Sequence, residues 1–254
     1  MRIVTWNVNS VRARLPRVTA WLLRHRPDLV CIQETKVQDA DFPRLELEAL
    51  GYAVEIHGQK AYNGVALLSR MNLRDVTRGF GDLDDTEKRV IAATVGGIRV
   101  MNLYVPNGEA VGSAKYARKL HWLDRFGEIL SERHRTDEPL LLCGDFNIAP
   151  EDRDVHDPKR WRDKVLCSEP ERERFRALVG WGLTDALRHL TPEGGIYTWW
   201  DYRLNGFPRN WGLRIDHFLV TAPVLSRVRT VTVDRDERGG EKPSDHAPVV
   251  LELE

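Results

Sequence analysis

The stretch Ser244-Asp245-His246-Ala247-Pro248-Val249-Val250-Leu251 joins a polar, turn-forming start to an apolar run. This pattern is typical of a loop that enters a buried strand, and it places a carboxylate and an imidazole where rigid scaffold meets loop. Histidine changes its charge most readily near neutral pH, and a nearby carboxylate can orient its ring or raise its pKa. The same combination of apolar strand and polar end recurs along the chain, so the pattern bears on both fold and function.

Apolar segments of strand length dominate the rest of the sequence. Gly96-Gly97 separates two of them and is typical of a two-residue hairpin turn. Helical spacing of apolar residues appears around Val18 and Trp21, and again at residues 113–133 and 171–179. Strands are predicted at residues 3–8, 29–32, 52–56, 64–69, 90–95, 98–104, 140–143, 213–220, 228–233 and 249–253.

The order of these segments predicts one domain over residues 1–254. Strands outnumber helices, and no Pro/Ser-rich linker divides the chain. The polar stretch 151–170 is expected to be an ordered loop anchored around Trp161, because long structureless loops are uncommon inside a domain. We therefore expect two β-sheets packed face to face, with helices on their outer faces.

Bulk composition limits the classes of partner. The chain has 254 residues, 38 basic and 38 acidic, so its zero net charge gives no global attraction to a polyanion, and any nucleic-acid contact needs a local basic patch. Cys31, Cys143 and Cys167 fit no zinc motif and are expected to be buried, reduced thiols. The N-terminus lacks the apolar segment of a signal peptide, and no run approaches the roughly 20 apolar residues of a membrane span. We expect a cytoplasmic protein, associated with the nucleoid while it acts.

Polar side chains end most of the predicted strands. Each Asn or Asp among them can be read as an ordinary turn residue. Glu34 and Asp216 resist that interpretation, because each continues an apolar run and a lone buried carboxylate is costly. The segments are Trp6-Asn7-Val8-Asn9, Gln33-Glu34-Thr35, Tyr104-Val105-Pro106-Asn107, Gly144-Asp145-Phe146-Asn147, Arg214-Ile215-Asp216-His217 and Asp245-His246.

Convergence of several carboxylates with amides and one histidine is the composition of a hard-cation site. Mg²⁺ prefers oxygen ligands and is often held by one or two carboxylates together with phosphate oxygens. The lack of clustered histidines or cysteines argues against zinc. Such a site suits phosphodiester hydrolysis, in which a carboxylate positions or deprotonates water and nearby donors neutralise the developing charge.

Seven motifs give this chain a family resemblance over essentially its whole length. In order they are TWNVNSVRARL, IQETK, NGVALLSR, NLYVPNG, CGDFNIAP, GLRIDHFLV and SDHAPV. Their order resembles that of the exonuclease III type of abasic-site (AP) endonucleases, within the endonuclease/exonuclease/phosphatase superfamily. The resemblance implies a four-layered α/β sandwich with two mainly antiparallel sheets. It also implies Mg²⁺- or Mn²⁺-dependent cleavage of DNA 5′ to abasic sites, with 3′-exonuclease and 3′-end-cleaning activity.

The resemblance also implies roles for individual residues. Asp145 is expected to activate the attacking water and Asn147 to orient it, while His246, held by Asp216, contacts the scissile phosphate. Glu34 is expected to be the principal metal ligand. The other implied site residues are Asn7, which supports both metal and nucleophile, Tyr104 and Asn107 at the phosphate, Asp245 as a second metal ligand, and Asn9, which stands where some relatives have Asp.

DNA contacts are expected from loops between the motifs. Basic and aromatic side chains there would bind phosphates without reading sequence, although any one of them can be an ordinary solvated residue. Trp199 and Leu213 match positions that line an abasic-sugar pocket in relatives, and an apolar pocket suits a flipped sugar that lacks a base. The predicted phosphate contacts are Arg12, Arg14, Lys60, Tyr62, Arg203 and Arg209.

Two alternatives stay open from the sequence. One is another metal-dependent phosphodiesterase or phosphatase of the superfamily, acting on RNA or a small phosphoester. The other is a non-catalytic DNA-binding module, which would not require the acidic cluster. The leading hypothesis is a monomeric enzyme that acts on double-stranded DNA carrying abasic sites or blocked 3′ ends, without contact to a membrane.

Overall fold

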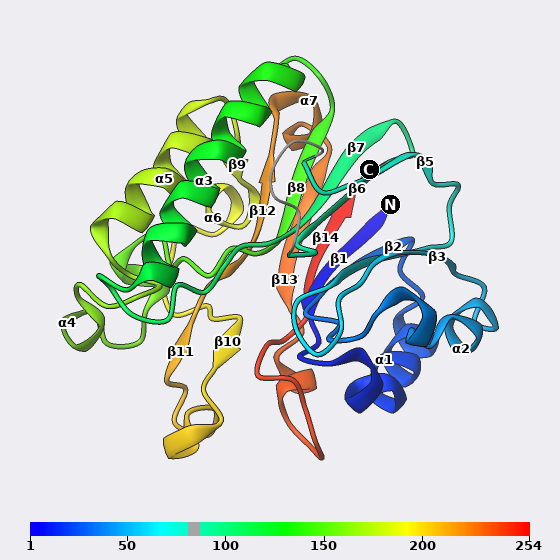
Figure 1. The fold of residues 1–254 in the computed structure, drawn as a ribbon, viewed down its shortest axis with the longest axis horizontal. Coiled ribbons are helices and arrows are strands. Elements are labelled where there is room, and N and C mark those ends of the chain that lie inside the picture. The colour runs from blue at the N-terminus through cyan, green and yellow to red at the C-terminus, as the bar shows by residue number, and fades with distance from the viewer. Residues whose placement is uncertain (81–86) are drawn as a thin grey trace.

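The computed structural model describes residues 1–80 and 87–254, and two six-stranded β-sheets form its centre (Figure 1). In spatial order, sheet A contains β13 (Val228–Val233), β14 (Val249–Leu253), β1 (Arg2–Asn7), β2 (Leu29–Gln33), β4 (Val65–Ser69) and β3 (Ala53–His57). Sheet B contains β5 (Arg74–Arg78), β6 (Val90–Val95), β7 (Ile98–Tyr104), β8 (Leu140–Asp145), β12 (Asp216–Val220) and β9 (Thr184–Asp185).

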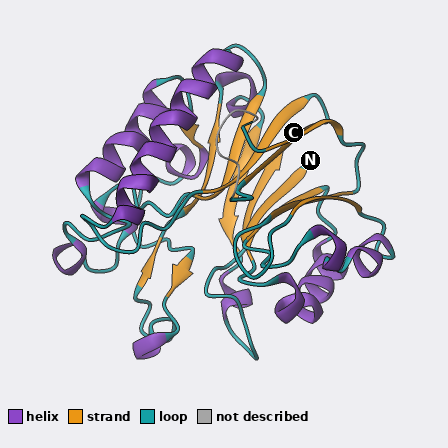
Figure 2. Cartoon of the chain, in the orientation of Figure 1, coloured by secondary structure: helices purple, strands orange, loops and turns teal. Residues whose placement is uncertain are grey.

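Helices cover the two outer faces of the sheets, as Figure 2 shows. The helices are α1 (Val11–His25), α2 (Arg44–Glu48), α3 (Ala114–Arg133), α4 (Pro158–Trp161), α5 (Glu169–Gly180), α6 (Ala186–Leu190) and α7 (Ala222–Leu225). Short 3-10 turns are η1 (Asp39–Asp41), η2 (Asp152–Asp154), η3 (Arg203–Asn205) and η4 (Arg235–Arg238). The residues of α1 and α2 pack on sheet A, and those of α3 and α5 pack on sheet B. The predicted four layers are therefore confirmed.

The sheets are mixed rather than purely antiparallel. In the described ranges, β1 and β2 pair in parallel in sheet A, and β7 and β8 do so in sheet B, while the other strand pairs are antiparallel. The mainly antiparallel character expected from the sequence is thus confirmed. The hairpin between β6 and β7 turns at Gly96 and Gly97, whose φ angles of 57° and 79° both lie in the region that such a turn requires.

Alternating side chains build the layers. In β8, Leu141 and Cys143 point into the core between the sheets, whereas Leu140 and Leu142 point toward the helices on sheet B. Because both faces of the strand are covered, its sequence is a continuous apolar run instead of an alternating one. The last residue of such a strand then lies at the edge of a rigid, buried layer.

Helix α3 begins where the Ser113 hydroxyl accepts a hydrogen bond from the Tyr116 N–H at 3.1 Å. Its buried stripe continues through Leu123 and Phe126 at spacings of three and four residues. One member of this stripe is Lys119, which is fully buried in an otherwise apolar surface. The sequence pattern gave no indication that this lysine faces inward.

One predicted strand is wrong in its extent. The chain over residues 213–220 forms two separate pieces, β11 (Gly212–Leu213), which pairs with β10 (Trp199–Trp200), and β12. Between them the N–H of Arg214 donates to the carbonyl of Asp154 instead of to a neighbouring strand. Backbone pairing with the 151–170 segment interrupts the ladder there. That segment is ordered as expected and contains α4, which includes Trp161.

Candidate active site

Ends of four central strands meet at one edge of the sandwich. Asn7 and Tyr104 are the last residues of β1 and β7, Asp145 is the last residue of β8, and Glu34 directly follows β2. The parallel pairing of β1 with β2 and of β7 with β8 brings these carboxyl ends together. Asp216 begins β12 directly opposite Asp145 in the antiparallel register, so two carboxylates face the same space.

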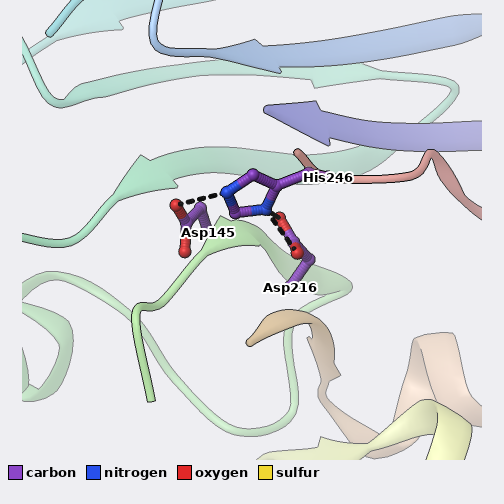
Figure 3. Close-up of side chains that lie close together, drawn as sticks. All are labelled: Asp145, Asp216 and His246. Carbon is purple, nitrogen blue, oxygen red and sulfur yellow. Dashed lines mark hydrogen bonds and ion pairs between the residues drawn. The ribbon is translucent and has the colours of Figure 1, made fainter. Parts of the chain in front are cut away.

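His246 lies between these two carboxylates (Figure 3). Its Nδ1 contacts Asp216 Oδ2 at 2.9 Å, and its Nε2 lies 3.7 Å from Asp145 Oδ2. All three side chains are buried. The Thr198 hydroxyl donates to Asp216 Oδ2 at 2.6 Å, so that carboxylate is held from both sides. The imidazole is oriented by Asp216 and presents its other nitrogen toward Asp145.

Burial and charge act in opposite directions on this trio. Burial alone would lower the pKa of His246, but the Asp216 and Asp145 carboxylates together raise it to about 10. Burial raises the pKa of Asp145 to about 7, against the lowering effect of His246 and with a further increase from Asp216. The ring is therefore an imidazolium at neutral pH, and Asp145 takes up and releases a proton close to neutral pH.

Amide groups fix the orientation of Asp145. Asn7 Nδ2 donates to Asp145 Oδ2 at 2.9 Å, and the Asn147 N–H donates to Oδ1 at 2.9 Å. Asn147 adopts a φ of 51°, a conformation that residues other than glycine rarely adopt. This left-handed turn returns its side chain toward the strand end, where Nδ2 lies 3.2 Å from Asp145 Oδ2.

Glu34 occupies the neighbouring part of the edge. Its φ is 57°, so the chain turns in a strained conformation immediately after β2. Asn7 Nδ2 donates to Glu34 Oε2 at 2.9 Å, and the Lys36 ammonium lies 2.8 Å from Oε1. The same ammonium donates to Asn9 Oδ1 at 2.6 Å. Lys36 is thus a cation that bridges two of the residues predicted to serve a metal.

Asp245 lies beside this group, where Asn9 Nδ2 and Trp199 Nε1 each donate to its carboxylate at 2.9 Å. Burial would raise the pKa of Asp245, but His246 and these two donors lower it, so the group stays ionised.

The donor set fits a hard divalent cation. Four carboxylates, Glu34, Asp145, Asp216 and Asp245, share this edge, and His246 and Lys36 are the cations that contact them among the described residues. Asp145, Asp216 and His246 each offer a ligand atom within 4.8 Å of the others. Both Asp216 oxygens lie within hydrogen-bond distance of His246 Nδ1, whereas Glu34 is held by Lys36, a long side chain that can move away. Oxygen donors with excess negative charge match Mg²⁺ or Mn²⁺ better than zinc.

The predicted phosphate residues Tyr104 and Asn107 lie at the same edge. Burial, together with the negative charges of Glu34 and Asp145, raises the pKa of the Tyr104 phenol well above its ordinary value, so it remains a proton donor. Arg89 stacks over the Tyr104 ring at 4.8 Å. Asn107 Nδ2 donates to Asn147 Oδ1 at 2.9 Å, which links the loops after β7 and β8.

The predicted DNA contacts divide into free and engaged side chains. Arg12, Lys60 and Tyr62 are exposed. Arg14 donates to the Tyr202 hydroxyl at 2.9 Å and is less available. Arg203 pairs with Asp201, and Arg209 stacks over the Trp211 ring at 4.6 Å, although both arginines are exposed.

Tryptophans line a pocket of about 470 Å³ beside this edge. Trp199, which we predict to line an abasic-sugar pocket, contributes to it together with Trp161 and Trp211, and Arg160 and Lys164 add positive charge. Leu213, the other predicted pocket residue, is fully buried and packs in the cluster beneath Trp199.

Sequence reasoning missed several residues of this site. Thr198, Lys36 and Arg89 each contact a predicted site residue, and Trp211 lines the pocket. Lys36, Thr198 and Trp211 lie within two residues of motifs or site residues already singled out, and adjacency was the signal that could have found them. For Arg89 the contact depends on how β6 pairs with β7.

Comparisons with known proteins agree with this geometry. The sequence model of the Endonuclease/Exonuclease/phosphatase family matches residues 4–246. An exodeoxyribonuclease III from Haemophilus influenzae is 38% identical over 266 residues, which cover 100% of both chains. The solved structure of the 3′ phosphatase NExo from Neisseria, bound to a product DNA hairpin, is 46% identical with a TM-score of 0.97, over 100% of this chain and 99% of that one. An AP endonuclease from Archaeoglobus fulgidus is 39% identical, with the same TM-score and the same coverage.

Proposed function

The chain belongs to the exonuclease III type of the endonuclease/exonuclease/phosphatase family, and from this we propose that it is a DNA-repair enzyme that hydrolyses the DNA backbone 5′ to abasic sites. The observation that carries the proposal is the buried trio Asp145, His246 and Asp216 at the edge where the two sheets meet. A binding module would gain nothing from burying two carboxylates and an imidazolium opposite a polyanion. Activities on 3′ ends, as exonuclease and as phosphatase, are part of the same proposal.

In this proposal Asp145 takes the proton of the attacking water. Its pKa of about 7 suits a base that must be ionised before the reaction and protonated after it. Asn7 and Asn147 keep the carboxylate in place through hydrogen bonds to both oxygens. The imidazolium of His246, held by Asp216, faces the phosphate and stabilises the negative charge that develops there. The Tyr104 phenol and the Asn107 amide are neutral donors for the same oxygens.

We propose that Glu34 and Asn7, with Asp245 and Asn9 beside them, hold Mg²⁺ or Mn²⁺. When bound, the ion would polarise a phosphoryl oxygen and neutralise charge on the leaving oxygen. Support comes from the oxygen donor set and from the Lys36 ammonium, which already bridges Glu34 and Asn9.

Duplex DNA carrying an abasic site is the proposed substrate. Exposed Arg12, Lys60 and Tyr62 would bind the backbone, together with Arg203, which lines the tryptophan pocket, Arg209, which stacks on Trp211, and Arg14 beside Tyr202. Because the chain carries no net charge, its overall charge does not attract DNA. The attraction must therefore come from these local cations, in spite of the nearby acidic edge. We propose that the pocket at Trp199 receives the flipped sugar, with Leu213 supporting Trp199 from beneath.

We further propose that residues 1–254 act as one catalytic domain and as a monomer, because both sheets contribute side chains to one site. None of the helices in the described ranges is long and apolar enough to cross a bilayer. Three buried free cysteines suit a reducing compartment, and we propose the cytoplasm, with nucleoid DNA as the place of action.

One incision assay tests the proposal. A duplex with a single tetrahydrofuran abasic analogue is incubated with the enzyme in Mg²⁺ or in EDTA, beside an undamaged duplex and an RNA of the same sequence. We expect Mg²⁺-dependent incision on the 5′ side of the analogue. Equal incision in EDTA, or cleavage of RNA alone, would contradict the proposal and favour another phosphodiesterase of the family. Binding to DNA without any cleavage would favour the non-catalytic module.

A further inference from the structure

Lys119 is a fully buried cation that the proposed chemistry does not use. It lies on the inner face of α3, among apolar side chains, with no exposed side-chain surface. A lysine ammonium has three N–H donors, and each of them has an acceptor here. The acceptors are the carbonyl of Asn107 at 3.1 Å, the carbonyl of Asn147 at 2.6 Å, and the carboxylate of Glu171.

Two of these acceptors belong to loops that form the site. Asn107 follows β7 and Asn147 follows β8, and their side chains are joined by the 2.9 Å hydrogen bond from Asn107 Nδ2 to Asn147 Oδ1. Asn147 in turn holds Asp145 through its N–H and its Nδ2. The ammonium therefore links the backbones of the two loops, and a hydrogen bond between the side chains of Asn107 and Asn147 links them a second time.

The lysine stem is packed as closely as its head group. Gly108 follows Asn107 with a φ of 93°, and a Cβ atom at that position would lie 3.1 Å from Lys119 Cδ. Any shift of the stem would therefore be transmitted to the loop after β7. An apolar replacement would keep the packing but leave the buried carbonyl of Asn147 without a donor, which is costly, and would also remove the part-buried contact to the carbonyl of Asn107.

Glu171, on α5, is satisfied independently of the lysine. Its Oε2 accepts from the Ser168 N–H at 3.1 Å and from the Ser168 hydroxyl at 2.5 Å, and its Oε1 also accepts from the Leu166 N–H at 3.1 Å. The ion pair by itself would be enough to hold α3 on α5. The contacts to Asn107 and Asn147 are not needed for that, and they connect Lys119 to the site.

We propose that Lys119 is a positioning residue, which acts through the backbones of Asn107 and Asn147 to set the amide pair that orients Asp145 and the substrate phosphate. The inference rests on the proposed function, because it assigns Lys119 to the same reaction. Displacement of a reacting group by about 1 Å can reduce turnover about 10²-fold. We therefore expect the contacts of Lys119 to affect kcat more than the affinity for DNA.

Two variants distinguish a positioning role of Lys119 from a purely structural role that only holds α3 on α5. Glu171→Gln removes the ion pair but leaves the carbonyl contacts, since even an uncharged amine has two donors. Glu171→Gln combined with Lys119→Met removes the ion pair and the carbonyl contacts together, without leaving a buried charge unpaired. The comparison of the two variants isolates the carbonyl contacts.

Steady-state incision of the abasic duplex in Mg²⁺ is measured well below the melting temperature of both variants. We expect Glu171→Gln to keep kcat within about threefold of the wild type. The double variant should lose about 10- to 100-fold in kcat while KM changes by less than about threefold, because most DNA affinity comes from phosphate contacts elsewhere. Equal kcat values for the two variants would overturn the inference.

A second readout does not depend on activity. The side-chain amide resonances of Asn107 and Asn147, assigned with Asn→Asp variants, are compared in ¹H–¹⁵N spectra. We expect them to shift or broaden in the double variant and to stay near their wild-type positions in Glu171→Gln. Unchanged resonances in the double variant would refute the positioning role even if activity fell. If the wild type fails to incise while the resonances move as expected, the positioning holds and the proposed function fails.

Discussion

Replacing Thr198 with valine should loosen the Asp216 carboxylate and destabilise the fold. The Thr198 hydroxyl donates to Asp216 Oδ2 at 2.6 Å and accepts from the N–H groups of Ile215 and Asp216 at 3.1 Å each. Thr198 is fully buried, so water does not replace these contacts. Valine has nearly the same shape and removes the hydroxyl alone.

The magnitude follows from these contacts. A hydrogen bond to a charged group contributes about 1.5–3 kcal/mol, and a buried donor left unpaired costs about 1–3 kcal/mol. Because the two N–H groups share one oxygen, we count one such cost and expect a loss of about 2.5–6 kcal/mol in the free energy of unfolding. For a chain of this size that corresponds to a melting temperature lower by about 5–24 °C. Turnover should fall at least about tenfold, because Asp216 no longer holds His246 in a single orientation.

Denaturant unfolding and incision of the abasic duplex check both parts of this prediction. Thr198→Ser is the matched control: it keeps the hydroxyl, loses one methyl group, and should cost about 1 kcal/mol with little effect on turnover. If Thr198→Val unfolds within about 1 kcal/mol of the wild type and incises at the same rate, the hydroxyl does not hold Asp216 as described.

Three further predictions concern catalysis, acid stability and the metal. Asp145→Asn and His246→Ala should each reduce turnover more than about 10²-fold in the incision assay while the chain still folds, because they remove groups that act on the transition state. Burial first, and then the charge of Arg214, lowers the pKa of His217 from 6.5 to about 4, so this buried ring is neutral in the folded state. Its contribution to stability is complete above pH 6.5 and is lost as pH falls toward 4, by about 2–3 kcal/mol in urea unfolding. Mg²⁺ at about 100 times its Kd should stabilise the wild type by about 2.7 kcal/mol in thermal unfolding, and Glu34→Gln should lose most of that gain.

Each of these predictions has a control and a result that would contradict it. Wild-type turnover in either site variant would remove that residue from the mechanism. His217→Gln, which keeps one donor and one acceptor, should show a flatter decline below about pH 6.5; a decline identical to that of the wild type would place the acid sensitivity elsewhere. NaCl at matched ionic strength controls for screening in the Mg²⁺ experiment, and an undiminished shift in Glu34→Gln would place the ion away from Glu34.

Much of the site was predictable because it lies at strand ends. Asn7, Glu34, Asp145 and Asp216 each interrupt or end an apolar run, and such a break is visible without a structure. The parallel order of the strands then brings them together. The layered fold was predictable for a similar reason, since runs such as 140–143 are apolar on both faces.

Other features depend on tertiary contacts that no local pattern encodes. Lys119 occupies an apolar helical stripe, and nothing near it in sequence shows that two loop carbonyls lie behind it. The break between Leu213 and Asp216 arises because Arg214 pairs with the distant Asp154, through its backbone and its guanidinium. A polar side chain that satisfies remote backbone groups resembles a surface residue until the fold is known.

The strand order also determines when the site can come into existence. The chain leaves sheet A after β4, builds sheet B, and returns to sheet A only with β13 and β14. His246 therefore arrives after every other member of the trio, immediately before the strand that pairs with β1. A chain interrupted during synthesis between residues 216 and 246 carries Asp145 and Asp216 without the imidazole between them. Such a chain lacks both the imidazolium proposed to face the phosphate and the strand β14 that pairs with β1, so we expect it not to incise DNA.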